Sequence, residues 1–374
     1  MEKKKRALCL LLAPILLLSM AKGRKAEGEA SICGIQYAAS TTEIIPTTVV
    51  DEGVNVSSRL WELLFGRKME STDIPERLVV GGDVFGARIY QGYIEASCDV
   101  EELNVKKGDI ITAVDGEKIA CVRDLAGVLQ IGDKRHTLSM LRGGAVIECK
   151  TECAEDCRKI LSAVRDGAAG IGTVTYINPT DMTFGGLGHG ICNEAGEVLP
   201  LSVGRVTGVI IGGAIKGEKG HPGELSGILT DRGLGEITKN TNTGVFGKLS
   251  EWRLDKSAAI PIARRDEVKP GAATIISTVK NGKKMSYSVE LYDINVNETG
   301  TKCFKVRVTD KALISMTGGI VRGMSGSPII QDGKLVGAVT HVMIADPTEG
   351  YGIFIENMLA AERAAKDAEG QRAA

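Results

Sequence analysis

The feature that most constrains the fold of this chain is a long succession of short apolar segments separated by glycines. Glycine accounts for 47 of the 374 residues, whereas aromatic residues make up only 4%. Segments such as 170–176 and 203–211 contain glycine and apolar residues in the pattern of strands. This composition favours many short strands joined by tight turns over a helical bundle. We therefore expect a mainly β chain with some α structure.

Bulk composition limits the classes of function. The length suffices for two domains, and a hydrophobic fraction of 43% permits a sizeable core. The net charge is −1, with no basic block after the first few residues, so nucleic-acid binding has no electrostatic support. The sequence contains no cofactor signature, and we expect no cofactor.

Cysteine spacing does not indicate a metal site. Three of the nine cysteines, Cys149, Cys153 and Cys157, are spaced by four, and there is no Cys-x-x-Cys pair. We therefore expect no zinc. A disulfide within this cluster remains open, and the other cysteines are interpreted as small buried apolar residues.

The N-terminus has the pattern of an export signal. Basic residues from Lys3 to Arg6 precede an apolar run over 7–21, which as a helix would span roughly 22 Å, less than a ~30 Å hydrocarbon core. We interpret 1–26 as a signal peptide or a short membrane anchor, and the choice between the two stays open. A polar linker and lead-in, 27–76, follows.

Residues 77–150 form the next predicted unit. A Gly-Asp turn, an apolar strand and an Asp-Gly turn lie within 105–119, a helix is expected over 122–131, and a closing strand starts at Leu138. This order resembles a bacterial, protease-associated PDZ domain. The resemblance implies a loop whose N–H groups bind a peptide carboxyl terminus, here Gly82, Asp83, Val84, Phe85 and Gly86. Alternatively, the groove binds nothing and packs on its neighbour.

Residues 157–358 are strand-rich and predict a β-barrel or sandwich, followed by a charged tail, 359–374. Within this region lies Gly323-Met324-Ser325-Gly326-Ser327-Pro328, between two apolar runs. A nucleophilic serine requires an exposed Oγ on a tight turn, and adjacent glycines allow N–H groups to converge on an oxyanion. By analogy with trypsin-like barrels, Ser325 is the predicted nucleophile, and the N–H groups of Gly323 and Ser325 form the oxyanion hole. Ser327 is the competing serine.

The base must be one of the four histidines: His136, His189, His221 and His341. His189 is flanked by glycines and precedes the serine, as the base does in trypsin-like barrels. His341 follows the serine turn closely and is the alternative. Asp310, at the end of a predicted strand, is the candidate carboxylate, and Asp181 and Asp346 compete with it.

Several segments together resemble the SpoIVB peptidase, or stage IV sporulation protein B, family. They are 184–190, 308–310, the serine turn with its flanks over 317–330, and 337–342. The order of signal, PDZ domain and protease matches as well, and implies a PDZ domain followed by a trypsin-like β-barrel serine protease. The family's catalytic residues fall on His189, Asp310 and Ser325.

The resemblance implies an endopeptidase of sporulation signalling. Such a protein is exported to the forespore intermembrane space, cleaves itself near the N-terminus, and cuts a membrane-embedded regulator of an intramembrane protease, which leads to activation of a late mother-cell sigma factor. The alternative is a non-catalytic PDZ-containing envelope scaffold. Met324 stands where trypsin-like enzymes place an aspartate that pairs with a new N-terminus, so trypsin-style activation is excluded.

Overall fold

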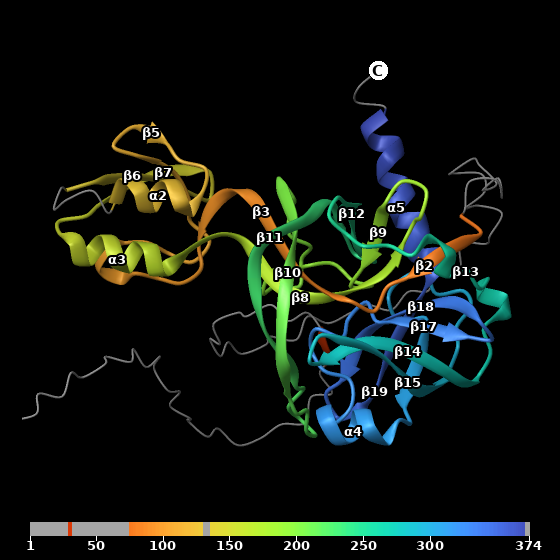
Figure 1. Cartoon of the computed structure of the whole chain (residues 1–374). Helices are drawn as coiled ribbons and strands as arrows, with labels where there is room; N and C mark the ends of the chain where they lie inside the picture. The colour runs from red at the N-terminus through yellow and green to blue at the C-terminus, as the bar shows by residue number, and fades with distance from the viewer. Residues whose placement is uncertain (1–28, 32–74, 130–134, 371–374) are drawn as a thin grey trace, which may run out of the picture.

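The computed structural model describes residues 29–31, 75–129 and 135–370, and these fold mainly as antiparallel strands. The predicted signal, 1–26, lies outside the described residues, as does most of the linker. Two barrels and a smaller unit can be followed in Figure 1. The expectation of a mainly β chain with a barrel-type protease fold is confirmed.

The first barrel closes through six strands in the order β8–β9–β12–β11–β10–β3, with β3 pairing back to β8. Their bounds are β3 Val84–Ala96, β8 Val164–Ile177, β9 Thr183–Gly186, β10 Val203–Ile215, β11 Glu224–Thr241 and β12 Gly244–Leu249. Phe85 and Phe184 meet edge to face inside it, with ring centroids 5.7 Å apart. Strands β10 and β11 extend beyond this barrel as a long hairpin towards α4 (Figure 1).

The second barrel closes through β18–β17–β14–β15–β16–β19, with β19 pairing back to β18. Their bounds are β14 Gly271–Lys280, β15 Lys283–Tyr292, β16 Phe304–Val308, β17 Pro328–Gln331, β18 Lys334–Met343 and β19 Asp346–Phe354. Helix α4 (Lys311–Thr317) follows β16. The short strand β1 (Glu29–Ser31) adds to the outer edge of β18.

Connecting elements attach the barrels to each other. Strand β2 (Arg77–Val80) pairs with both β8 and β13 (Ala259–Pro261), which is flanked by the 3₁₀ turns Lys256–Ala258 and Arg265–Glu267. Helix α5 (Ile355–Gly370) begins inside the core of the second barrel, because Ile355, Met358 and Leu359 are buried there. The charged tail expected from residue 359 is therefore the continuation of a packed helix.

The smaller unit is inserted into the first barrel, between β3 and β8. It contains the 3₁₀ turn Glu101–Leu103, β4 Ile110–Val114, β5 Glu117–Lys118, α2 Val122–Leu129, β6 Thr137–Arg142, β7 Ala145–Lys150 and α3 Ala154–Ala163. Its own core reaches from Ile94 to Ala163. Figure 1 shows it projecting sideways from the barrels.

The insertion moves both boundaries of the predicted 77–150 unit. Strand β3 is continuous over thirteen residues, and its first half pairs with β8 and β10 of the barrel. Helix α3, which the sequence placed at the start of the protease domain, packs its Cys157 and Ile160 into the smaller unit. A strand shared by two units has no break in its periodicity, so no sequence pattern marks this boundary.

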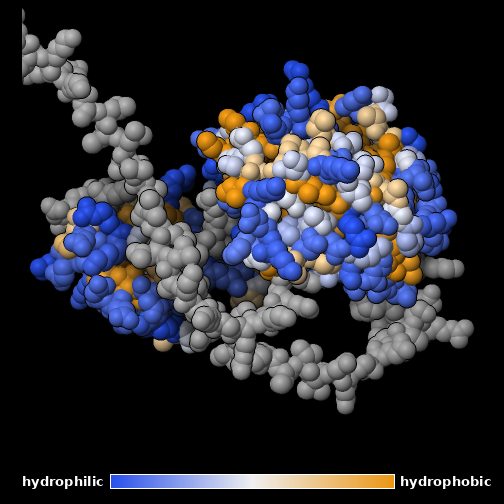
Figure 2. Space-filling view, turned by 90° about the horizontal axis from the view of Figure 1, so that it is seen from below, coloured by the Kyte–Doolittle hydropathy of each residue, from blue (hydrophilic) through white to orange (hydrophobic). Residues whose placement is uncertain are grey.

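The surface shows where apolar residues remain. Seen from below, the larger body is a mosaic of small hydrophobic patches separated by hydrophilic residues (Figure 2). Ile210 and Ile228 are cross-strand partners on the β10–β11 hairpin and are 65% and 71% exposed. Scattered exposed aliphatic residues of this kind are ordinary on protein surfaces.

Candidate active site

Ser325 is presented by the loop between α4 and β17. Gly326 has φ +90°, and a Cβ on it would lie 2.1 Å from the Thr173 carbonyl oxygen and 2.5 Å from Leu187 N. Only glycine fits this combination of left-handed backbone and close approach. The side chain of Met324 packs into the core of the second barrel, which turns the neighbouring Ser325 towards the first.

Two threonines of the first barrel hold this loop. Thr173 Oγ1 donates to Gly323 O at 2.9 Å, and Thr175 Oγ1 donates to Gly326 O at 2.8 Å. Thr173 N also donates to Ser325 O at 2.9 Å. Both threonines are fully buried, so these hydrogen bonds fix the serine loop of one barrel against a strand of the other.

His189 reaches the serine from the first barrel. It follows β9, and its Nε2 lies 2.9 Å from Ser325 Oγ. Leu187 and Gly188, which lie between the end of β9 and His189, have φ of +66° and +70°. This left-handed backbone turns the chain sharply after β9. The structure therefore brings together the serine and the histidine that the sequence selected.

The environment of His189 favours its neutral form and fixes its tautomer. Burial lowers its pKa, while a hydrogen bond to Gly190 O acts in the opposite sense. His189 Nδ1 lies 2.8 Å from Gly190 O, which can only accept, so Nδ1 carries the proton. In the neutral ring, Nε2 is then an acceptor facing the Ser325 hydroxyl, which is the arrangement a general base requires.

Asp310 lies elsewhere. Its carboxylate caps α4, accepting from Leu313 N at 2.9 Å and from Ser288 N at 3.4 Å. The Nδ1 position at which a triad carboxylate is expected is taken by the Gly190 carbonyl oxygen. The structure thus does not bring Asp310 to His189, because the Asp310 carboxylate caps the start of α4.

The competing carboxylates also serve local turns. Asp181 accepts from Thr183 N at 3.0 Å, and Asp346 accepts from Thr348 N at 2.9 Å. Both contacts span two residues, as in Asx turns.

The other candidate histidines and the second serine take different positions. His341 lies beside His189, with ring centroids 5.2 Å apart. Burial, followed by the electrostatic influence of His189, which would act when that ring is protonated, and of Lys302, lowers the pKa of His341 to about 3. Ser327 Oγ is buried and has no hydrogen-bond partner within the described ranges, so it has no base. His136 pairs with Asp115 in the smaller unit.

The backbone around the nucleophile offers two free donors. Met324 N donates to Val321 O and Ser327 N donates to Met324 O, which closes two successive turns. The N–H groups of Gly323 and Ser325, on either side of Met324, donate to no acceptor in the part of the chain described. Gly323 has φ +93°, consistent with a turn that only glycine readily adopts.

The predicted PDZ carboxylate loop is not available for a ligand. Gly82 N donates to Val174 O, and Val84, Phe85 and Gly86 pair with β8. Asp83 forms an ion pair with Lys284 of the second barrel. The assignment of these residues to a peptide groove is therefore corrected, because their backbone groups are already used by the barrel.

Two buried cysteines of the described residues, Cys149 and Cys303, are poor nucleophiles. Cys149, Cys153 and Cys157 are free thiols, and burial raises the pKa of Cys149 and of Cys303 to about 11. Such thiols stay protonated at neutral pH. Within the described residues, no group of three or more His, Cys, Asp or Glu side chains could hold a metal ion.

Sequence reasoning missed Thr173, Thr175, Thr340 and Gly190. Ser325 Oγ donates to Thr340 O at 3.0 Å, so this carbonyl competes with His189 Nε2 for the single hydroxyl proton. The alternation Thr173-Val174-Thr175-Tyr176 was visible, and it places both threonines on one face of β8. Only the fold shows that the serine loop covers this face.

Comparison with known proteins agrees with this geometry. Residues 158–359, more than half of the chain, match the family model described as SpoIVB peptidase S55. No curated protein and no solved structure matches the chain.

Proposed function

The chain belongs to the SpoIVB peptidase S55 family and is thus a serine peptidase of sporulation, and we propose that Ser325 is its nucleophile and His189 its general base. One observation carries this proposal: His189 Nε2 and Ser325 Oγ are 2.9 Å apart across the interface of the two barrels. A peptidase acts on a protein or peptide substrate, and no cofactor is required by this chemistry.

The proposed mechanism follows from the tautomer of His189. Nε2 accepts the Ser325 proton as Oγ attacks the scissile carbonyl, and later returns a proton to the leaving amine. The N–H groups of Gly323 and Ser325 stabilise the negative oxygen of the tetrahedral intermediate. The Gly190 carbonyl orients the imidazolium in place of a carboxylate.

The site is closed as it stands. Ser325 is 0% exposed and His189 4%, so a substrate carbonyl reaches the nucleophile only after neighbouring groups move. We attribute control of this opening of the site to the smaller unit inserted between β3 and β8. Glu194, in the loop after His189, forms ion pairs with Lys107 of that unit and with Arg165 at the start of β8.

The proposed biological role is sporulation signalling. In this role the protein cleaves itself and then cuts a membrane-embedded regulator of an intramembrane protease, so that a late mother-cell sigma factor becomes active. Self-cleavage is supported by β1, because Ser31 pairs with His341, next to Thr340 and the nucleophile. Strand β1 is therefore close to the site.

The proposed location is the forespore intermembrane space, with residues 1–26 acting as a signal or a short anchor. These residues lie outside the described ranges. Among the helices that are described, none combines the length and apolarity needed to cross a membrane.

The test compares two serines in one loop. The full-length Ser325→Ala protein should keep its N-terminal segment and fail to react with a fluorophosphonate probe, whereas Ser327→Ala should be processed and labelled. Processing in purified Ser325→Ala would refute the nucleophile assignment. Absence of both activities in the unsubstituted protein would favour the non-catalytic scaffold.

A further inference from the structure

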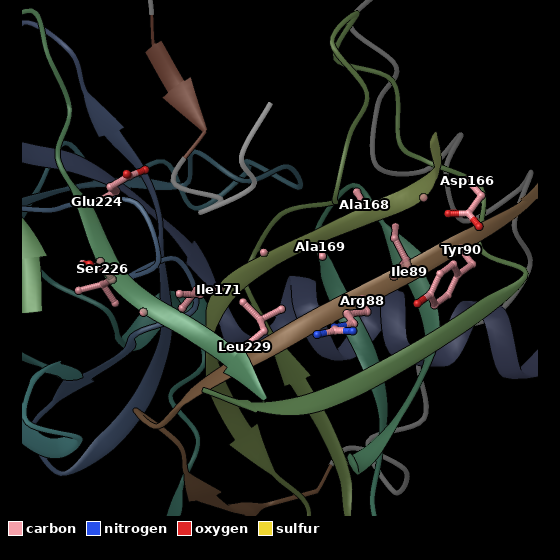
Figure 3. Close-up of a pocket in the computed structure, with 14 residues that line it drawn as sticks. Arg88, Ile89, Tyr90, Asp166, Ala168, Ala169, Ile171, Glu224, Ser226 and Leu229 are labelled. Carbon is pink, nitrogen blue, oxygen red and sulfur yellow. The ribbon is translucent and has the colours of Figure 1, made fainter. Parts of the chain in front are cut away.

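A cleft of about 480 Å³ lies between β3, β8 and the first half of β11 (Figure 3). Strand β8 lines it with Asp166–Ile171, β3 with Arg88–Tyr90, and β11 with 224–227 and Leu229. Four of the β8 residues are glycine or alanine, which leaves room beside the strand.

The cleft borders an edge of β8 that has no partner strand among the described residues. Consecutive side chains of a strand point to opposite faces, so the run Asp166–Ile171 presents backbone as well as side chains to the cleft. Strand β3 occupies one edge of β8, pairing with 167–173. On the other edge, β9 begins to pair only at Val174, which leaves 167–172 without a neighbouring strand in the described part of the chain.

This free edge leads to the nucleophile. Thr173 is its last residue, with N donating to Ser325 O at 2.9 Å and O accepting from Leu187 N at 3.2 Å. Because every second residue of a strand directs its N–H and C=O to the same edge, Ile171 and Ala169 direct theirs into the cleft.

The opposite wall ends at the same loop. Leu225 N donates to Arg322 O at 2.8 Å, and the Leu225 side chain lies against Gly323. Both walls of the cleft therefore converge on the residues that carry the proposed oxyanion hole.

Strand β1 sets the direction in which a peptide passes the nucleophile. It is antiparallel to β18, with Glu29 opposite Met343 and Ser31 opposite His341, so its chain runs towards Thr340 and Ser325. A peptide on this track reaches Ser325 with its carboxyl side leading. Residues before the scissile bond then lie along β18, and residues after it continue beyond Ser325.

We propose, building on the peptidase function above, that this cleft binds the substrate segment that follows the scissile bond, as a strand added to the edge of β8. Arg88 selects an acidic side chain in that segment. Backbone hydrogen bonds to a free edge provide affinity for any extended peptide, and side-chain contacts provide selectivity.

Arg88 is the cation available for this role. Arg88 forms an ion pair with Asp231 at 3.7 Å. Because the Asp231 side chain is 100% exposed, this ion pair is weak. Of the acidic residues that line the cleft, Asp166 already accepts from Val122 N at 2.8 Å. Glu224 forms a β-bridge with Arg322, next to the nucleophile loop.

The experiment uses the full-length protein and a proteome-derived peptide library, with cleavage sites read by mass spectrometry. We expect Asp and Glu to exceed Asn and Gln by roughly 10-fold at one position after the cleaved bond, as for a partly exposed charge-assisted hydrogen bond. Arg88→Glu should reverse this preference towards Lys and Arg. Arg232→Glu, on β11 but outside the cleft lining, is the matched control and should keep it.

A second measurement tests the backbone contacts without altering the enzyme. A peptide that the enzyme cleaves is synthesised again with an ester in place of one backbone amide after the scissile bond. Cleavage should slow by roughly 10-fold when the ester stands at every second position, and should not change when it stands at the positions between. Cleavage without any preference after the scissile bond, or an unchanged preference in Arg88→Glu, overturns the cleft assignment while the peptidase function stands. Absence of both cleavage and fluorophosphonate labelling overturns both.

Discussion

His189 Nε2 lies 2.9 Å from Ser325 Oγ, although 136 residues separate them in the chain. The serine belongs to the second barrel and the histidine to the first. The site therefore exists only when both barrels are folded and docked, and two threonines of β8 fix that docking at the serine loop.

The first prediction separates the two adjacent histidines. His189→Ala removes the acceptor of the Ser325 proton and should lower kcat by about 10⁴-fold or more. His341→Ala should lower it by less than about 10-fold, because His341 has no recorded contact with Ser325 Oγ. Initial rates on an internally quenched peptide measure both. Equal losses in the two variants would contradict the assignment of the base.

The second prediction concerns Asp310. Asparagine caps a helix about as well as aspartate, so Asp310→Asn should retain both stability and activity. Asp310→Ala should lose about 1 kcal/mol of unfolding free energy, with activity falling only as folded protein is lost. Denaturant unfolding and rates on the same preparations are compared. If Asp310→Asn is folded but about 10⁴-fold slower, the carboxylate orients His189 after all.

The histidines and Asp310 show which parts of the site could be predicted from the sequence. The serine turn and the glycines around His189 identified both residues, because a nucleophile on a tight turn and an imidazole in a confined space have local requirements. The partner of His189 Nδ1 had no local signal, since any residue's carbonyl can accept there. Asp310 had the chemistry of a triad member, but in the fold its carboxylate caps a helix.

The fold was predicted to a similar depth. Glycine-separated strands indicated a β-barrel or sandwich, the family resemblance favoured the barrel, and the Gly-Asp and Asp-Gly turns indicated the smaller unit. Its insertion between β3 and β8 was missed because β3 runs unbroken from one unit into the other. For the same reason Gly82 to Gly86 was assigned to a peptide groove, whereas long-range pairing places these residues in the first barrel.

The third prediction concerns pH. Burial lowers the pKa of His189, and burial and neighbouring charges lower that of His341 to about 3. In the unfolded chain both titrate near ~6.5, so below that pH the unfolded state binds more protons and the free energy of unfolding falls as the pH drops towards about 3. The melting temperature of Ser325→Ala should therefore decrease from pH 7 to pH 4.

Substituting one histidine isolates its contribution from that of the carboxylates. Between pH 7 and pH 4, the melting temperature of Ser325→Ala/His341→Gln should fall less than that of Ser325→Ala alone. Parallel curves for the two proteins would show that His341 does not titrate between its unfolded and folded pKa values. The acid limb of kcat/KM in the unsubstituted enzyme should likewise lie below the ordinary histidine pKa, because the base remains neutral there.

The fourth prediction tests the serine loop with two glycines. Gly326→Ala places a Cβ 2.1 Å from Thr173 O, so backbone must move, and we expect a loss of more than about 2 kcal/mol and of fluorophosphonate labelling. Gly333→Ala is the matched control: φ is +74°, but no atom lies within 4 Å of the added Cβ. It should cost about 1 kcal/mol and leave labelling intact. Similar losses in both variants would mean that backbone conformation alone, rather than contact between the barrels, limits position 326.

The fifth prediction concerns control by the smaller unit inserted between β3 and β8. Ala96 and Val164 are paired, so residues 97–163 can be replaced by an Asn-Gly turn that closes β3 and β8 as a hairpin and leaves the first barrel intact. This excision removes Lys107 and frees the Glu194 loop that follows His189 from the unit.

If the unit holds the site closed, cleavage of an added peptide should rise by about 5-fold or more. Lys107→Ala, which removes one ion pair and keeps the unit, should give a smaller increase in the same direction. Unchanged self-processing and unchanged cleavage of the added peptide in a folded excision variant would exclude the unit as the switch.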